Sequence, residues 1–261
     1  MRKDYITATA PADDETGFVE KYWTAVWERE GGPQGHIDQI PRKEEYRVMA
    51  PWIAKLPAGA RILDGGCGLG EWTMYFARQG FSVAGLDLSR QTVKQLQERF
   101  PEAEFVDGDI RHMTFPDASF DAYFSWGVFE HFEAGLQDCI VEAFRVLKPG
   151  GYLFISTPRD NLRQALLGTF ARPRRAGAPL RFYQWRLTPA EIARELEIGG
   201  FELLETKPIH KKQGVLRSLH HEFGLPYDWT LTKGLSLALT PFIPASVVAH
   251  MVLAVARKPL A

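Results

Sequence analysis

Residues 61–71 read Arg61-Ile-Leu-Asp-Gly-Gly-Cys-Gly-Leu-Gly-Glu71. In this run an apolar stretch leads into glycines at positions 66, 68 and 70, and a helix-like segment follows. Without a Cβ atom, a glycine backbone can pass close to a ligand and can adopt conformations that are closed to other residues. The pattern predicts a strand, a turn that can approach a ligand, and a helix. A tight turn without a ligand would have the same sequence, so neighbouring motifs must decide between the two.

From residue 60 to residue 158, short apolar runs alternate with amphipathic stretches. Strands are expected at residues 60–64, 81–87, 103–106, 120–125 and 152–157. Helices are expected between them, at residues 71–79, 90–100 and 133–147. Such alternation predicts right-handed crossovers and a parallel sheet that is covered by helices on both faces.

The remaining segments are less regular. Residues 1–57 are expected to form a leader, mobile over 1–17, and a helical lid with helices at 18–30 and 41–56. Residues 58–261 are expected to form one domain with insertions at about 159–187 and 208–247. Its later elements are a helix that begins at Thr188-Pro189-Ala190-Glu191 and strands at 201–207 and 248–256.

Acidic residues follow the first three predicted strands. Asp64 ends the first, and Asp87 ends the second, where a carboxylate can accept hydrogen bonds from both hydroxyls of a ribose. Gly108-Asp109-Ile110 follows the third, where a carboxylate and a backbone N–H could read the edge of an adenine. Because open parallel sheets bind ligands at the carboxyl ends of their strands, these residues favour a ligand at the glycine turn.

Five motifs resemble, in order and spacing, those of class I S-adenosylmethionine-dependent methyltransferases, of the type 11-like kind with small-molecule acceptors. They are Asp64-Gly-Gly-Cys-Gly-Leu-Gly70, Asp87, Gly108-Asp109-Ile110, Phe120-Asp121 and Arg145-Val-Leu-Lys-Pro-Gly-Gly151. The resemblance covers residues 60–158 closely and 188–207 loosely. It implies an α/β, Rossmann-like fold: a seven-stranded, mostly parallel sheet with an antiparallel last strand, helices on both faces and an N-terminal helical lid.

The resemblance also implies S-adenosylmethionine as the cofactor. Gly66 and Gly68 would lie against its amino-acid part, and Asp87 would bind its ribose. Asp109 would lie near the adenine, with Leu88 on the adenine face. The residues expected at the cofactor are Tyr22, Asp64, Gly65, Gly66, Cys67, Gly68, Gly70, Asp87, Leu88, Asp109, Ile110, Ser125, Trp126 and Gly127.

Charge supports this cofactor over a dinucleotide. A sulfonium suits a pocket rimmed by Asp64, Asp87, Asp109 and Glu130, whereas Asp64 would repel the diphosphate that a dinucleotide presents to a helix N-terminus. A nicotinamide-dependent enzyme, one alternative, would also need glycine spacing closer to Gly-x-Gly-x-x-Gly. A second alternative is a methyltransferase-like module that binds without turnover, because a fold alone does not prove catalysis.

Two groups of side chains are candidates for contact with the reacting atoms. His131 lies just beyond the fourth predicted strand, where it could accept a proton from a hydroxyl or amine nucleophile. Alternatively, Glu130-His131 begins the next helix and bonds only to its own backbone. On the N-terminal helix, Tyr22, Trp23 and Trp27 could cover the cofactor, Tyr22 above all, or could pack on the edge of the sheet.

Three further stretches have a structural and a functional interpretation each. Residues 172–186 combine arginines with Phe182, Tyr183 and Trp185, and could bind a carboxylate or phosphate of the acceptor or form a solvated loop. His220-His221-Glu222 has no further ligands at convincing spacing, so no metal is expected. The apolar residues 235–249 are expected in the core, with an oily acceptor pocket or peripheral contact with a membrane as alternatives.

Composition excludes several classes of protein. A formal net charge of −1 disfavours broad nucleic-acid binding, which needs a basic surplus. Two cysteines provide neither a disulfide framework nor a structural zinc site. We see no signal peptide at the start and no apolar run of transmembrane length. These features lead us to expect a cytoplasmic enzyme, and they point to no particular oligomeric state.

Overall fold

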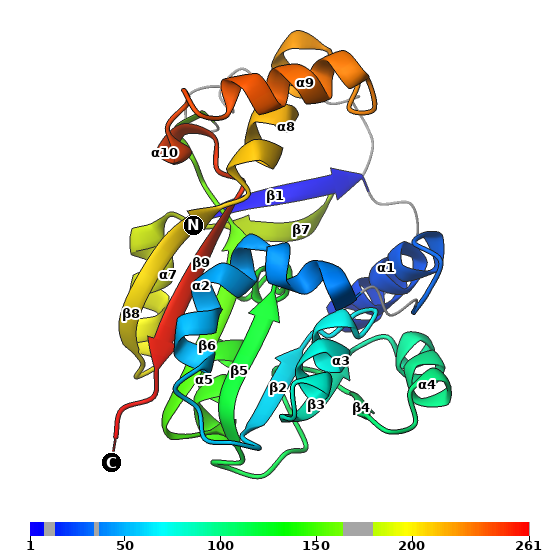
Figure 1. Ribbon diagram of the computed structural model, residues 1–261, viewed down its shortest axis with the longest axis vertical. Coiled ribbons are helices and arrows are strands. Elements are labelled where there is room, and N and C mark those ends of the chain that lie inside the picture. Colours follow the sequence, from blue (N-terminus) through cyan, green and yellow to red (C-terminus); the bar gives the residue numbers. More distant parts are fainter. Residues whose placement is uncertain (8–13, 34–36, 164–179, 261) are drawn as a thin grey trace.

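The fold is built on a seven-stranded sheet (Figure 1), and the computed structural model describes residues 1–7, 14–33, 37–163 and 180–260. The strand order is β4-β3-β2-β5-β6-β9-β8. Strands β2 to β6 are parallel, and β9 runs antiparallel to both β6 and β8. This confirms the predicted Rossmann-like fold with an antiparallel last strand. The strands are β2 (Arg61–Gly65), β3 (Ser82–Asp87), β4 (Glu104–Asp107), β5 (Phe120–Trp126), β6 (Leu147–Pro158), β8 (Glu202–Ile209) and β9 (Met251–Arg257).

Helices cover both faces of this sheet. Successive side chains of each strand point to opposite faces, so both faces present apolar side chains that helices bury. Ile62 and Phe124 pack in one core cluster with side chains of α2, α3 and α4. Leu63 and Tyr123 pack in the other with side chains of α5 and α7. The bounds of these helices are α2 (Glu44–Ile53), α3 (Glu71–Arg78), α4 (Arg90–Arg99), α5 (Gln137–Val146) and α7 (Pro189–Ile198).

Local signals explain where two of the helices begin. Thr188 caps α7 and accepts a hydrogen bond from the amide of Glu191, whose side chain bonds back to Thr188, as the sequence predicts. Helix α5 begins at residue 137 and not at 133, because Gly135 takes a positive φ of 111° and interrupts the chain. Before it, Phe129–His131 forms the short 3-10 helix η2. Similarly, η1 (Ile37–Arg42) precedes α2.

A second, two-stranded sheet was not predicted. Strand β1 (Arg2–Thr7) pairs antiparallel with β7 (Leu180–Arg186). The expectation of a mobile leader is therefore wrong for residues 2–7, and part of the insertion at 159–187 is a strand. The two partners lie far apart in the chain, so neither has a neighbouring run or turn that marks a hairpin.

The insertion at 208–247 is mainly helical and forms a cap with α8 (Lys211–Phe223), α9 (Thr230–Leu239) and α10 (Ala245–Val248). In Figure 1 this cap lies at the top of the molecule, and the β1–β7 sheet lies between it and the large sheet. The last strand begins at residue 251, after α10, and not at 248. Helix α1 (Glu15–Arg29) stands apart from the cap, beside α4. In the described part of the chain, no helix is long and apolar enough to cross a bilayer.

Candidate cofactor site

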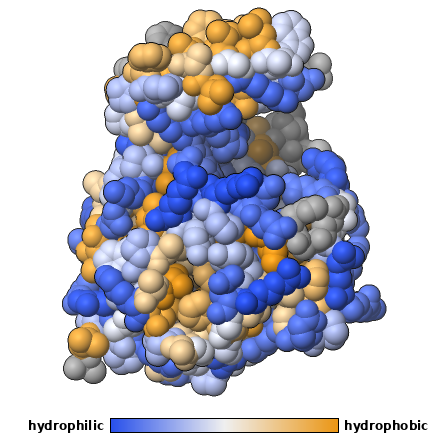
Figure 2. All heavy atoms as spheres, viewed as in Figure 1, coloured by the Kyte–Doolittle hydropathy of each residue, from blue (hydrophilic) through white to orange (hydrophobic). Residues whose placement is uncertain are grey.

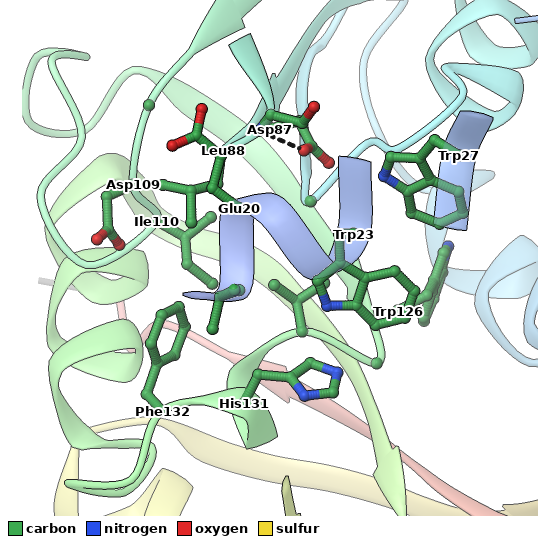
Figure 3. Close-up of a pocket in the computed structure, with 16 residues that line it drawn as sticks. Glu20, Trp23, Trp27, Asp87, Leu88, Asp109, Ile110, Trp126, His131 and Phe132 are labelled. Carbon is green, nitrogen blue, oxygen red and sulfur yellow. Dashed lines mark hydrogen bonds between the residues drawn. The ribbon is translucent and has the colours of Figure 1, made fainter. Parts of the chain in front are cut away.

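A pocket opens at the carboxyl ends of β2, β3, β4 and β5, and α1 lies across it (Figure 3). It contains about 600 Å³ of space that is partly open to solvent. The lining residues are Val19, Glu20, Trp23 and Trp27 of α1, together with Gly66, Asp87, Leu88, Ser89, Gly108, Asp109, Ile110, Trp126, Gly127, Val128, His131 and Phe132.

The glycine turn brings backbone to the pocket where a side chain could not fit. Gly66 has a φ of 79°, and a Cβ atom there would overlap the side chain of Val128. Gly68 has a φ of 51°, and its Cβ would lie 2.8 Å from the ring of Trp27. Both positions therefore require glycine, through conformation and through space.

Asp87 is buried at the end of β3 and faces the pocket. One carboxylate oxygen accepts from the amide of Gly68 at 2.8 Å, and the other accepts from the amide of Ser89 at 2.9 Å. Burial raises the pKa of Asp87, although these amide hydrogen bonds favour the charged form. Because each oxygen has a second lone pair, the carboxylate can still accept hydrogen bonds from a ligand.

Asp109, at the end of β4, is held by Arg111. The two side chains are joined by hydrogen bonds of 3.0 and 2.6 Å, and Arg111 also donates to Glu15 and Thr16 on α1, at 2.8 Å each. Burial favours the neutral acid, but the hydrogen bonds and charge of Arg111 hold the pKa of Asp109 below its usual value. Arg111 therefore ties α1 to the loop that follows β4 and carries Asp109.

Helix α1 contributes aromatic walls and an acid. Trp23 and Trp27 stack with ring centroids 5.1 Å apart, and Figure 3 shows Trp23 above His131. The indole N–H groups of Trp27 and Trp126 are buried and have no hydrogen-bond partner within the part of the chain that the structure describes. These two donors can therefore serve a ligand that enters the pocket.

His131 lies at the floor of the pocket, between aromatic rings. Its ring centroid is 5.2 Å from that of Trp23 and 5.1 Å from that of Tyr183, and Nδ1 is 2.8 Å from the carbonyl oxygen of Tyr183. Burial lowers the pKa of His131, although the carbonyls of Tyr183 and Gly127 favour the protonated ring. The ring is therefore neutral near pH 7. Because a carbonyl only accepts, Nδ1 carries the proton and Nε2 carries the lone pair.

Of the residues expected at the cofactor, about half line the pocket. Asp64 lies beneath the glycine turn and accepts from Thr73 at 2.7 Å; burial raises its pKa to about 7. Ser125 donates to the carbonyl of Gly65 at 2.6 Å. The hydroxyl of Tyr22 points to that of Tyr183, 3.5 Å away. The expected residues outside the lining are Tyr22, Asp64, Gly65, Cys67, Gly68, Gly70 and Ser125.

Sequence reasoning missed Glu20 in the pocket and Arg111 beside it. Glu20 stands three residues before Trp23 and seven before Trp27, a spacing that places all three on one face of a helix. That spacing was a usable signal. No sequence signal marked Arg111, because its contact with α1 depends on the tertiary fold.

The other candidate stretches lie elsewhere. Arg172, Arg174 and Arg175 fall outside the described residues. Phe182, Tyr183 and Trp185 belong to β7, and Trp185 donates to the carbonyl of Phe132 at 3.0 Å. His220 stacks on Tyr227 with ring centroids 3.9 Å apart. The described residues contain no group of three or more His, Cys, Asp or Glu that could hold a metal ion.

Comparisons with known proteins agree on the nature of the domain. Residues 63–155 match the family described as a methyltransferase domain. A probable S-adenosylmethionine-dependent methyltransferase of Mycolicibacterium smegmatis is 32% identical over 171 residues, which are 65% of this chain and 63% of that protein. The 2-methyl-6-phytyl-1,4-hydroquinone methyltransferase of a Synechocystis species is 36% identical over 175 residues, 61% of this chain and 53% of that protein. The chain thus spans less than two thirds of the length of either relative.

A solved structure shares the fold over nearly the whole chain. It is the 1,6-didemethyltoxoflavin-N1-methyltransferase of Burkholderia thailandensis, with bound 1,6-didemethyltoxoflavin and S-adenosylhomocysteine. The TM-score is 0.59 with 16% sequence identity, over 99% of this chain and 96% of that one.

Proposed function

We propose that this chain, which carries a class I S-adenosylmethionine-dependent methyltransferase domain, transfers the methyl group of that cofactor to a small-molecule acceptor by in-line displacement. The observation that carries the proposal is the charge of the pocket. Among the residues that the structure describes, the lining includes Glu20, Asp87 and Asp109 and neither lysine nor arginine. Such a lining suits a sulfonium and would repel the diphosphate of a dinucleotide.

The residues present fit each part of the cofactor. Asp87 has lone pairs for the ribose hydroxyls, and Gly66 lines the pocket on the side where the amino-acid part would lie. Asp109 and Ile110 line the pocket and would face the adenine. The unpartnered indole N–H of Trp27 and that of Trp126 offer donors for a carboxylate. When bound, the cofactor supplies a methyl group that is already activated for transfer.

The protein's own contribution is alignment, exclusion of water and removal of a proton. Holding a nucleophile in line with the methyl–sulfur bond can lower the barrier by roughly 7–11 kcal/mol. Trp23 and Trp27 of α1 would keep water from the sulfonium. We propose that Nε2 of His131 accepts the proton that the methyl acceptor loses. Its lone pair remains available because Nδ1 donates to the carbonyl of Tyr183.

Two measurements test this proposal. Calorimetry should detect binding of S-adenosylmethionine and of S-adenosylhomocysteine, and none of NAD. Incubation with methyl-labelled cofactor and a metabolite extract should move the label into small molecules. Binding without any transfer would favour a non-catalytic module, and preferential binding of NAD would overturn the proposal.

We also propose that the protein acts in the cytoplasm. Cys67 and Cys139 are both buried and free. Free thiols are typical of a reducing compartment, which supports the cytoplasm as the place of action.

A further inference from the structure

Arginines from four separate segments lie around the end of β6 and His250, beside the candidate cofactor site. In the β1–β7 pair, Arg2 lies opposite Arg186. The residue after β6, Arg159, forms a bridge with Leu187 and donates its backbone N–H to the carbonyl of His250 at 2.9 Å. From the cap, Arg217 of α8 reaches the same histidine, with its Nη1 3.2 Å from Nε2.

These arginines have fewer acids around them than their charge requires. Arg186 pairs with Asp4 at 2.6 Å, and Arg2 pairs with Asp160 at 3.1 Å. Within the described residues, neither Arg159 nor Arg217 has an acidic partner. In the described part of the chain, the one hydrogen bond of the Arg159 guanidinium goes to the carbonyl of Ala245.

Two donor atoms of this cluster are buried and unused. Arg159 is 9% exposed and Arg186 is 8% exposed, and among the described residues neither Nε of Arg159 nor Nη1 of Arg186 has a hydrogen-bond partner. A buried guanidinium N–H without a partner is costly. In natural proteins such atoms are completed by ordered water, by an ion or by a ligand.

The neighbouring titratable groups add no negative charge near pH 7. Burial raises the pKa of Glu130 to about 8, so this carboxyl is largely protonated. Burial and the charges of Arg217 and Arg186 lower the pKa of His250 to about 3, so its imidazole is neutral and accepts from Arg217. The excess positive charge of the arginines is therefore not compensated.

The cluster adjoins the cofactor pocket through Gly127. This glycine lines the pocket, and a Cβ atom on it would lie 3.4 Å from Oε1 of Glu130. Glu130 in turn precedes His131, which also lines the pocket. An acceptor held by the arginines would therefore lie on the His131 side of the pocket.

We propose that Arg159, Arg186 and Arg217 bind an oxyanion, a carboxylate or phosphate group, on the methyl acceptor. This inference rests on the proposed function and assigns its substrate class: a small acidic molecule. Guanidinium groups donate two parallel hydrogen bonds to such anions, each stronger than a hydrogen bond between neutral groups. Arg186 belongs to the arginine-rich residues 172–186, whereas Arg159 and Arg217 lie outside that stretch.

The test is anion binding by the full chain in the presence of saturating S-adenosylhomocysteine. The probes are inorganic phosphate and succinate, titrated at constant ionic strength in an anion-poor buffer and followed by calorimetry and thermal melting. Wild type should bind one of them, and Arg217→Gln and Arg159→Gln should each weaken that binding about tenfold or more, as loss of a charge-assisted hydrogen bond requires. Arg194→Gln is the matched control, because Arg194 is exposed on α7 and away from the cluster.

The melting temperature gives a second readout. Without anion, Arg217→Gln should melt no lower than wild type, since repulsion among the arginines is relieved. Added phosphate or succinate should raise the melting temperature of wild type and of Arg194→Gln only. Equal anion binding in all four proteins, or none in wild type, overturns the inference. Failure of S-adenosylhomocysteine to bind would instead overturn the proposed function.

A separate surface carries a second inference. On α9 the usual pattern is reversed: Thr232 and Ser236 are fully buried, and Leu231 and Leu237 are 61% and 62% exposed. Ser236 donates to the carbonyl of Lys212 on α8 at 3.0 Å. Small polar side chains therefore dock α9 on α8, and the leucines face outward.

Other large apolar side chains extend this surface over the cap. Figure 2 shows a concentration of hydrophobic residues across the top of the molecule, where Figure 1 places α8 and α9. Monomeric proteins rarely expose a contiguous apolar patch of this kind without a partner. The exposed members, which we call the cap surface, are Phe223, Tyr227, Trp229, Leu231, Leu235, Leu237, Leu239 and Phe242.

The lysines around the cap surface favour an anionic partner. Lys212 and Lys233 are exposed on α8 and α9, and α9 contains no acid. Two acids lie nearby: Glu222, at the end of α8, is paired with Arg163 at 2.6 Å, and Asp228, between α8 and α9, is exposed. Apolar and aromatic side chains next to lysines are typical of helices that lie in the interface of an anionic membrane.

We infer that the cap surface docks on the surface of an anionic lipid bilayer, with α9 parallel to it. A helix of ten residues is about 15 Å long, too short to span the bilayer. The test is co-sedimentation with vesicles of phosphatidylcholine containing about one third phosphatidylserine. The double variant Leu231→Ser, Leu237→Ser should lower the bound fraction at least fivefold. Ile198→Ser, equally exposed at 61% on α7, should not.

Two results would overturn this second inference. One is equal binding of wild type and the double variant to the vesicles. The other is no vesicle binding together with a dimer, seen in sedimentation, that the double variant dissociates; that result would assign the cap surface to a second copy of the chain.

Discussion

Asp87 accepts hydrogen bonds from the amides of Gly68 and Ser89, one to each carboxylate oxygen. The same side chain thus shapes the glycine turn and presents its remaining lone pairs to the pocket. Its position at the end of a strand followed from the apolar run before it. Its hydrogen bonds to the turn could not be predicted, because they need the crossover that brings β3 beside β2.

We expect Asp87→Ala to weaken binding of S-adenosylhomocysteine at least tenfold, or about 1.4 kcal/mol, because the ribose hydroxyls lose their acceptor. Calorimetry on the folded variant measures this. Asp107→Ala is the control, since Asp107 is exposed at the end of the neighbouring strand β4. Unchanged affinity in Asp87→Ala would show that the ribose lies elsewhere.

His131→Ala should slow methyl transfer by about 100-fold or more if the imidazole accepts the proton, with little change in cofactor affinity. Because burial lowers the pKa of His131, the neutral base persists below the ordinary value of 6.5. The rate of wild type should therefore fall only as the pH drops further, and this acidic limb should vanish in the variant. His112→Ala, an exposed histidine, should match wild type. A fully active His131→Ala protein would leave the residue a packing role.

Glu130 should make the folded chain less stable as the pH rises. Its folded pKa of about 8 exceeds the ordinary 4.5, so its contribution is complete below pH 4.5 and is lost as the pH rises through about 8. Glu130→Gln keeps the neutral shape and should remove a slope of at most about 1.4 kcal/mol per pH unit from the free energy of unfolding. Urea titrations from pH 5 to pH 8, an interval of about three units, measure the slope. Parallel curves for the two proteins would contradict a buried, protonated Glu130.

At the scale of elements, the sequence predicts best where strand and helix are neighbours in the chain. Strands β2, β3, β5 and β6 contain continuous apolar runs because both of their faces are buried. Strand β1 instead reads Arg-Lys-Asp-Tyr-Ile-Thr, and its partner β7 is distant in the chain, so local pattern fails there. Helix α1 was predicted, but which of its aromatic residues face the pocket depends on how Arg111 holds it.

We expect Arg111→Ala to loosen α1 from the domain. The variant loses hydrogen bonds to Glu15, Thr16 and Asp109, so the helix that bears Trp23 should open more often. Proteolysis within α1 should become faster, and affinity for S-adenosylhomocysteine should fall about tenfold. Arg90→Ala, which removes an exposed arginine of α4, is the matched control. Equal cleavage rates in both variants would mean that other contacts hold α1.

At the scale of the whole molecule, the pocket is enclosed by segments from both halves of the chain. Helix α1 crosses it, and β7, from the insertion after β6, supports its floor through the bond between His131 and Tyr183. The two segments meet where the ring of Tyr22 packs on that of Tyr183, with centroids 5.4 Å apart. A cofactor that orders α1 should therefore also order β7, which carries Arg186 of the proposed acceptor site.

Hydrogen exchange with and without S-adenosylhomocysteine measures this coupling. The ligand should slow amide exchange in α1 and β7 but leave α7 unchanged, because α7 packs away from the pocket. Tyr22→Ala removes the contact between the two segments, so protection by the ligand should remain in α1 and disappear from β7. If β7 were protected equally in the variant, the coupling would run through η2 and His131 instead, since these residues touch both the pocket and the strand.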